Sequence, residues 1–100
     1  MNIVDTNKTK IMALCKEYNV ARLYVFGSVL TPKFNKESDV DFIVNFKDIN
    51  LWDYADNYFN LKNALETTVN RDVDLLEDDA VSNPYLRSSI DSTKQLVYGE

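Results

Sequence analysis

Hydrophobic and polar residues follow a helical period over three stretches of the chain. Over residues 6–18, apolar side chains recur three, four and seven positions apart, which predicts an amphipathic helix with one buried stripe. The same spacing over residues 51–68 predicts a second, longer helix. A third helix is expected from Pro84 to Tyr98, because Asn83 can cap its first turn and proline is favoured at the first helical position.

Three short apolar runs between these helices predict β-strands. They cover residues 21–26, 40–46 and 72–76, and their lengths fit strands better than helices. A polar connection over residues 29–38 separates the first two runs, and Thr31-Pro32 fits the start of a short helical turn within it. This order of elements indicates a small mixed α/β or α+β domain, with about three core strands flanked by helices.

Two of the expected strands carry candidate chemistry at their ends. Gly27-Ser28 follows the first apolar run, and Asp39 and Asp41 open the second one. Residues i and i+2 of a strand point to the same face, so the two carboxylates project together, about 6–7 Å apart along the chain. Like charges this close repel unless a cation lies between them. Two Mg²⁺ ions about 3.5–4 Å apart would fit there, and such pairs are typical of phosphoryl and nucleotidyl transfer.

A third carboxylate, Asp74, lies in the expected third strand. If that strand lies beside the second, Asp74 joins the Asp-x-Asp pair in a patch that can share two metal ions. Gly27 has no side chain, so its backbone can approach a phosphate closely, and Ser28 adds a hydroxyl donor. The alternative is structural, because an isolated Asp-x-Asp is usually a solvated strand end or a turn cap, and Asp72 competes with Asp74 for the same face.

Composition narrows the chemistry that the chain can carry. One hundred residues allow one domain, which we expect to span residues 1–100. There is no histidine, which excludes Ser-His-Asp and Cys-His catalysis and the usual zinc sites. A metal must therefore be held by carboxylates, which favours Mg²⁺ or Mn²⁺. The net charge of −5 offers no basic face to a duplex or a tRNA, so a large nucleic-acid substrate is not expected.

The chain shows no sequence feature of membrane insertion or secretion. No apolar stretch approaches the ~20 residues of a membrane helix, and the first residues have neither a basic flank nor an apolar core. The single cysteine, Cys15, rules out an intramolecular disulfide and fits a reducing compartment. We therefore expect a cytoplasmic protein with no membrane partner.

The segments Val25-Phe26-Gly27-Ser28 and Ser38-Asp39-Val40-Asp41-Phe42 resemble the nucleotidyltransferase superfamily that includes DNA polymerase beta. The pattern of that superfamily is Gly-Ser, a spacer, Asp-x-Asp and a third acid on a later strand. The small size is similar to its minimal nucleotidyltransferase (MNT) branch, whose members are often the antitoxin partners of HEPN-domain toxins. The resemblance covers nearly the whole chain and implies the polymerase beta-like nucleotidyltransferase fold.

The resemblance also implies roles for individual residues, matched position by position. The implied catalytic residues and metal ligands are Asp39, Asp41 and Asp74. The implied nucleotide-binding residues are Gly27, Ser28 and Ser38. ATP would be the substrate, two Mg²⁺ ions would be the cofactor with Mn²⁺ as an alternative, and Asp74 would hold the ion on the side of the nucleophile.

The chain departs from the pattern directly after Gly-Ser. Many minimal members carry Arg-x-Arg-Gly there, whereas residues 29–32 of this chain read Val-Leu-Thr-Pro. Arginine binds phosphate through two parallel hydrogen bonds, so the usual phosphate clamp is missing. Lys33 or Lys36 could replace it, although solvent exposure is the simpler interpretation for both.

The resemblance implies transfer of AMP from ATP to a hydroxyl group. Larger family members have a further helical domain for the acceptor, so here the acceptor surface must come from another molecule or a second subunit. We expect a protein partner, namely a HEPN toxin that this chain inactivates as an antitoxin, docked in part by exposed aromatic residues. The open alternatives are sequestration with weak or lost catalysis, transfer to a small molecule such as an aminoglycoside, and nucleotide sensing without transfer.

Overall fold

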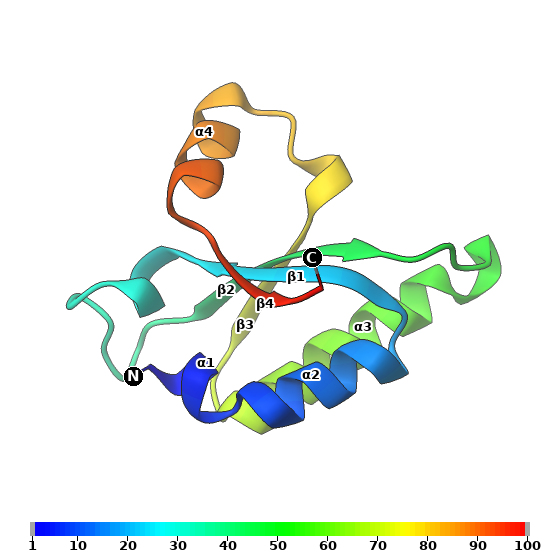
Figure 1. Ribbon diagram of the computed structural model, residues 1–100, viewed down its shortest axis with the longest axis horizontal. Helices are drawn as coiled ribbons and strands as arrows, with labels where there is room; N and C mark the ends of the chain where they lie inside the picture. Colours follow the sequence, from blue (N-terminus) through cyan, green and yellow to red (C-terminus); the bar gives the residue numbers. More distant parts are fainter. Residues whose placement is uncertain (1, 100) are drawn as a thin grey trace.

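A four-stranded mixed sheet lies at the centre of the computed structural model, which describes residues 2–99 (Figure 1). Its strands, in chain order, are β1 (Val20–Phe26), β2 (Val40–Phe46), β3 (Val73–Glu77) and β4 (Gln95–Tyr98). Their order across the sheet is β3-β2-β1-β4. β2 runs parallel to β3 and antiparallel to β1, and β4 pairs antiparallel with the other edge of β1. The expected mixed fold is confirmed, with one strand more than predicted.

Helices cover the two faces of the sheet unequally. The helices are α1 (Ile3–Thr6), α2 (Lys8–Glu17), α3 (Leu51–Val69) and α4 (Pro84–Thr93). α2 and α3 lie next to each other on one side of the sheet, whereas α4 stands alone on the opposite side (Figure 1). Two short 3-10 turns, η1 (Gly27–Leu30) and η2 (Asp78–Ala80), directly follow β1 and β3. No helix within residues 2–99 combines the length and the apolar character that crossing a membrane requires.

The hydrophobic core lies between the sheet and the α2–α3 pair. The side chains that β2 contributes to it are Val40, Phe42 and Val44. Leu61 and Leu65 of α3 are completely buried against this face. Among the described residues, only Ile43 and Ile90 are buried hydrophobic residues outside this cluster. Ile43 points to the other face of β2 and Ile90 belongs to α4, so the opposite side of the sheet has far fewer buried hydrophobic residues.

The chain after Thr93 differs from the prediction. It does not continue as a helix to Tyr98, because the backbone of Lys94 is extended (φ −59°, ψ 146°) and the following residues form β4. Val97 fitted the helical spacing, but it is a strand residue in the core and only 6% exposed. The unpaired edge of β1 supplies backbone hydrogen-bond partners for this segment, and local spacing carries no information about them.

Two other boundaries also differ from the prediction. The helix expected over residues 6–18 is interrupted at Asn7, because Asn2 caps a separate first turn, α1. Thr31-Pro32 does not start the expected helical turn: the helical turn of this connection is η1, which begins at Gly27 and ends at Leu30, and Thr31 is extended. Both corrections leave the order of the larger elements unchanged.

Candidate active site

Gly27 brings the end of β1 against a carboxylate of β2. Its backbone is left-handed (φ +82°), and it starts η1 immediately after Phe26. A Cβ atom at this position would overlap Oδ2 of Asp41. Both observations require glycine, since other residues adopt this backbone only with strain. The Gly-Ser turn therefore lies directly beside the Asp41 carboxylate.

The strand register aligns the predicted carboxylates. Asp41 of β2 pairs with Phe26 of β1 on one side and with Asp74 of β3 on the other. Asp39 precedes β2 by one residue and shares the face of Asp41 through strand alternation. The structure thus places Gly27, Asp41 and Asp74 on three neighbouring positions, with Asp39 next along the chain.

The other two carboxylates influence Asp41 electrostatically. Burial, followed by the negative charges of Asp74 and Asp39, raises the pKa of Asp41 from its ordinary 3.8 to about 6. A divalent cation would offset such repulsion, and a set of carboxylate oxygens without histidine fits Mg²⁺ or Mn²⁺. Within residues 2–99, no three His, Cys, Asp or Glu side chains are close enough together to hold a metal ion as they are oriented. The trio is therefore a set of neighbours rather than a preformed cage.

The two serines expected at the nucleotide are half-buried and lie in different connections. The carbonyl of Ser28 accepts hydrogen bonds from the backbone N–H and the hydroxyl of Thr31, at 2.9 and 2.8 Å, which close η1. Across residues 2–99 the Ser28 hydroxyl forms no hydrogen bond of its own, so it is available to a ligand. The Ser38 hydroxyl accepts the N–H of Asn35 at 3.1 Å and thereby shapes the loop before Asp39.

A cavity of about 410 Å³ opens beside Gly27. The residues that line it are Gly27, Leu30, Thr31, Ser89, Thr93 and Gln95. The last three come from the junction of α4 and β4, a region that the helical spacing of its apolar residues predicts to be one continuous helix. The only available signal was the pair of hydroxyl residues Ser89 and Thr93, four positions apart and so on one helical face. The end of α4 therefore lies next to the Gly-Ser turn and forms one wall of this cavity.

Residues 29–32 contribute no cation to this site. Val29 packs into the core with 5% exposure, and Leu30 is half-buried. Lys33 and Lys36 are both exposed in the loop that follows. The phosphate-binding candidates of η1 are therefore its backbone N–H groups and the hydroxyl of Ser28.

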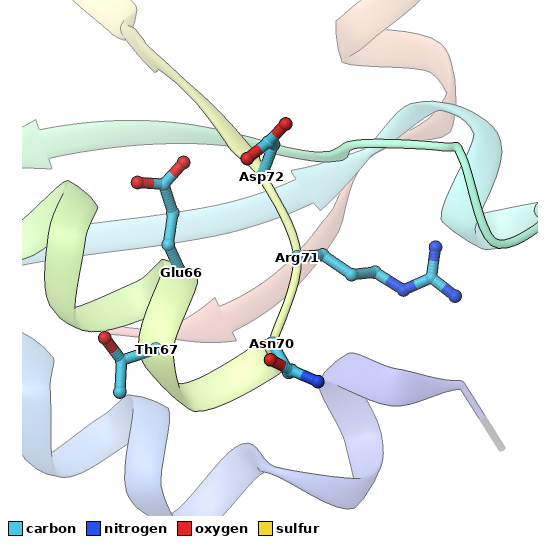
Figure 2. A pocket seen from close by; sticks show the side chains of 5 residues that line it. All are labelled: Glu66, Thr67, Asn70, Arg71 and Asp72. Carbon is cyan, nitrogen blue, oxygen red and sulfur yellow. The ribbon is translucent and has the colours of Figure 1, made fainter.

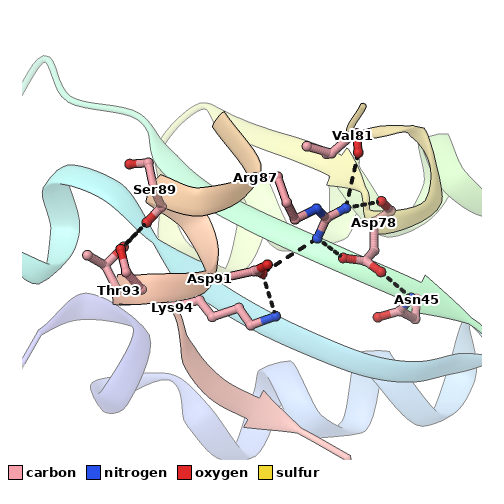
Figure 3. Close-up of polar contacts among 9 residues, drawn as sticks. Asn45, Asp78, Val81, Arg87, Ser89, Asp91, Thr93 and Lys94 are labelled. Atoms are coloured by element: carbon pink, nitrogen blue, oxygen red, sulfur yellow. Dashed lines mark hydrogen bonds and ion pairs between the residues drawn. The ribbon is translucent and has the colours of Figure 1, made fainter. Parts of the chain in front are cut away.

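The cations on the α4 side of the sheet are engaged with carboxylates (Figure 3). Arg87 lies 2.7 Å from Asp78 and 3.6 Å from Asp91, and Lys94 lies 3.0 Å from Asp91. Burial raises the pKa of Asp78, but hydrogen bonds from Arg87 and Asn45 outweigh this effect and hold the pKa below its ordinary value. This polar network, rather than a broad apolar contact, attaches α4 to the sheet.

A second cavity, of about 350 Å³, lies at the connection between α3 and β3 (Figure 2). The residues that line it are Glu66, Thr67, Asn70, Arg71 and Asp72. None of them was a predicted site residue. The side chain of Arg71 points away from those of Glu66, Thr67 and Asp72 (Figure 2) and contacts the loop that precedes Asp39.

Sequence comparison identifies the family. The family model described as "Polymerase beta, Nucleotidyltransferase" matches residues 9–100. Two predicted protein adenylyltransferases of Methanocaldococcus jannaschii are each 32% identical to this chain. The first match covers 82% of this chain and 79% of the relative, and the second covers 85% and 82%.

Solved structures share the fold. A predicted minimal nucleotidyltransferase gives a TM-score of 0.77 at 25% identity and covers 95% of both chains. A chain of a toxin–antitoxin crystal structure with AMP-PNP gives 0.72 at 22% identity, over 94% of this chain and 74% of that one. The structure of a tri-AMPylated Shewanella oneidensis HEPN toxin in complex with an MNT antitoxin contains a chain that gives 0.66 at 20% identity, over 96% and 72%. With its Gly-Ser turn beside aligned carboxylates, this chain belongs to the polymerase beta nucleotidyltransferase family and has the fold of its minimal members.

Proposed function

We propose that this chain transfers AMP from ATP to a hydroxyl of a protein partner with Mg²⁺ as the cofactor. The partner would be a HEPN toxin, which this chain inactivates as a cytoplasmic antitoxin, and one domain over residues 1–100 would carry the activity. The observation that carries the proposal is the position of Gly27 against Asp41, which is itself paired with Asp74. A backbone that can approach a phosphate thus lies beside carboxylates that can hold cations.

Each residue of the site has a distinct task in this proposal. Asp39, Asp41 and Asp74 hold the Mg²⁺ ions, which, when bound, neutralise phosphate charge and make the acceptor hydroxyl easier to deprotonate. Gly27 and Ser28 donate hydrogen bonds from η1 to the triphosphate. The acceptor oxygen forms a bond to the α-phosphorus, the bond from the α-phosphorus to the bridging oxygen breaks, and pyrophosphate leaves. The hydroxyl proton passes to solvent on the side of Asp74, whose carboxylate is exposed.

A protein acceptor is supported by relatives and by the surface. The related toxin–antitoxin structures include one with AMP-PNP and one with a tri-AMPylated HEPN toxin. Large apolar side chains are also exposed on this chain, among them Trp52 (88%) and Tyr85 (84%). Tyr85 belongs to α4, on the side of the sheet that carries the carboxylates. Trp52 lies in the first turn of α3, beyond the opposite end of β2 from Asp41.

Sequestration without transfer is the second candidate function, and one observation favours it. Residues 29–32 supply no cation, and the nearby Arg87 and Lys94 already pair with Asp78 and Asp91. Weak binding of the triphosphate would leave docking, rather than modification, as the inhibitory step.

A second copy of the chain is the other molecule that could provide an acceptor surface.

The test is co-expression with the neighbouring gene product, followed by co-purification and intact mass measurement of the partner. Transfer predicts a partner that is heavier by one or more AMP groups with the wild-type chain and unmodified with Asp41→Asn. Asp72→Asn is the matched control, because it removes an exposed carboxylate two residues from Asp74 and should keep full activity. A stable complex with a partner of unchanged mass would establish sequestration instead, and no complex with any candidate partner would return small molecules to consideration.

A further inference from the structure

The connection between α3 and β3 places one arginine where it can control a carboxylate that it does not touch. We propose that Arg71 is a positioning residue, which holds Asp39 in place by fastening the loop at residues 34–38 to the start of β3. The role of Asp39 as a metal ligand belongs to the proposed function, on which this inference rests. We refer to the contacts of Arg71 with residues 34–38 as the Arg71 clamp.

The guanidinium of Arg71 makes three contacts with the loop. Its carbon lies 4.2 Å from the centroid of the Phe34 ring. Its Nη1 donates hydrogen bonds to the carbonyl of Asn35 at 2.5 Å and to the carbonyl of Ser38 at 3.1 Å. A planar guanidinium can stack on a ring and donate hydrogen bonds in its own plane at the same time, whereas an ammonium group is a point charge. The clamp therefore depends on arginine and not only on a positive charge.

Arg71 and the next residue, Asp72, hold the backbone on both sides of Asp39. Arg71 holds the carbonyl of the peptide group that joins Ser38 to Asp39. The peptide group after Asp39 is held by Asp72, whose carbonyl accepts the N–H of Val40 at 3.0 Å. Both peptide groups that flank the Asp39 Cα atom are thus tied to two consecutive residues. Since these groups set the direction of the Cα–Cβ bond, they set where an otherwise exposed carboxylate points.

The end of α3 holds Arg71 in position. Asn70 ends the helix in the left-handed conformation (φ 56°, ψ 43°), and the backbone N–H of Arg71 returns to the carbonyl of Glu66 at 3.3 Å. Glu66 also accepts the N–H of Val73 through its side chain, at 3.0 Å. Figure 2 shows the arginine extending away from the carboxylates of Glu66 and Asp72. Within residues 2–99 it forms no ion pair, so its charge interacts with loop carbonyls and a ring.

Apart from Arg71, the loop is attached to the rest of the protein mainly through the Phe34 side chain. No residue from 31 to 38 is fully buried, although Phe34 is half-buried and packs against the core. The other hydrogen bonds of residues 35–38 stay within residues 33–38, as between Ser38 N–H and the Asn35 carbonyl at 3.1 Å. Local bonds of this kind keep a turn intact but do not attach it to the rest of the protein. Loss of Arg71 should therefore release residues 35–38 while the core remains folded.

The first measurement is amide hydrogen exchange of the metal-free protein at Ser38 and Val40. Both amides should exchange roughly tenfold faster or more in Arg71→Ala and in Arg71→Lys, while the amides of β1 are unchanged. Lys36→Ala is the matched control, since it removes a positive charge from the same loop outside the clamp, and its exchange should equal that of the wild type. Unchanged exchange at both amides in Arg71→Ala would overturn the proposal.

The second measurement is the affinity for Mn²⁺, by titration with paramagnetic or calorimetric detection. Loss of a positive charge near carboxylates should by itself strengthen cation binding, as expected for Lys36→Ala. Loss of positioning should instead weaken it, roughly 10- to 100-fold in Arg71→Ala. The opposite signs separate the two effects. Equal or tighter binding by Arg71→Ala would overturn the positioning role even if the loop is released.

A double-mutant cycle links the clamp to Asp39. In an Asp39→Asn background, Arg71→Ala should have no further effect on Mn²⁺ affinity, because the positioned group is already gone. Full additivity of the two substitutions would show that Arg71 acts elsewhere and would overturn the proposal. If the wild-type chain binds no Mn²⁺ while exchange responds as expected, the proposed metal-dependent function is wrong, the positioning role falls with it, and Arg71 is only a structural anchor.

Discussion

The two faces of the central sheet are built from opposite kinds of contact. The face under α2 and α3 is a continuous apolar cluster, in which Leu61 and Leu65 are fully buried against the strands. The face under α4 has only Ile43 and Ile90 as buried hydrophobic residues among those described. The rest of its attachment is polar and runs through Arg87 and its partners (Figure 3). The first face supplies stability, and the second leaves room and water for charged groups.

The contrast explains how a small chain can place carboxylates reliably. Successive residues of β2 point to opposite faces, so Val40 and Phe42 enter the core while Asp41 faces α4. A shift of the strand by one residue would bury Asp41 in the core, where an unpaired charge is very costly. The apolar face therefore fixes the register, and the register in turn fixes Asp41 beside Asp74.

The largest expected effect is a cavity on the apolar face. Leu65→Ala should lower the free energy of unfolding by about 2–5 kcal/mol, because Leu65 is completely buried. Each kcal/mol corresponds to roughly 4–8 °C in melting temperature for a domain of this size. Leu51→Ala removes an equal side chain that is 86% exposed, and it should change stability by less than about 0.5 kcal/mol. Similar unfolding curves for the two variants would contradict the assignment of the core to this face.

The next largest effect is expected at the Gly27-Ser28 turn, which follows β1. Gly27→Ala should cost about 1–3 kcal/mol, since alanine is strained at a φ of +82°. It should also abolish nucleotidyl transfer, because the added methyl group displaces the Asp41 carboxylate. Urea unfolding and a transfer assay would be run on the same preparations. Ser28→Ala is the control for the turn, and it should weaken ATP binding with little change in stability. Full transfer by Gly27→Ala would show that contact between the turn and Asp41 is not required.

Local patterns predicted most of the fold but not its last strand. β1, β2 and β3 were predicted because apolar runs and flanking turn residues are properties of short segments. β4 was missed because Val97 fits both a helix that starts at Pro84 and a strand, and only the free edge of β1 decides between them. Asp74 was predicted to lie beside Asp41 only if the third strand pairs with the second. The parallel pairing of β2 with β3 meets this condition.

The residues that support the site could not be predicted from the sequence. Arg71 contacts carbonyls 36 and 33 positions earlier in the chain, and a single arginine after a helix has no pattern that points to such partners. Ser89 and Thr93 line the Gly27 cavity only because the chain turns from α4 into β4. Residues that carry chemistry can thus be recognised by type and spacing, whereas residues that position them depend on long-range folding.

A smaller effect should appear in how the stability of the metal-free protein depends on pH. The pKa of Asp41 is raised to about 6, above its ordinary 3.8, so the folded state binds this proton more tightly than the unfolded state does. This contribution to stability is complete below roughly pH 4 and is lost as the pH rises through about 6. Asp41→Asn cannot titrate, so its melting temperature should match that of the wild type near pH 4 and exceed it near pH 7. Calorimetry in the presence of a chelator measures the melting temperatures of both proteins at the two pH values.

Two further measurements sharpen this prediction. Mg²⁺ should raise the melting temperature of the wild type near pH 7 and reduce the advantage of Asp41→Asn, because a bound cation replaces the lost proton. Asp74→Asn should move the wild-type pH dependence to lower pH, since the charge of Asp74 is one cause of the raised pKa of Asp41. A constant difference between Asp41→Asn and the wild type at all pH values would contradict the electrostatic coupling of the patch.

The smallest effect on stability should come from the exposed aromatic residues, and it separates the faces by function. Tyr85→Ala and Trp52→Ala remove side chains that are 84% and 88% exposed, so each should change stability by less than about 0.5 kcal/mol. If the partner docks over α4, beside the carboxylates, Tyr85→Ala should reduce co-purification and AMP transfer to the partner much more than Trp52→Ala does. In-line transfer requires the acceptor hydroxyl at the α-phosphate, and Trp52 lies in the first turn of a helix that starts beyond the far end of β2. A larger loss with Trp52→Ala would place the docking surface on the stable face and would require a partner long enough to reach around the sheet edge to Asp41.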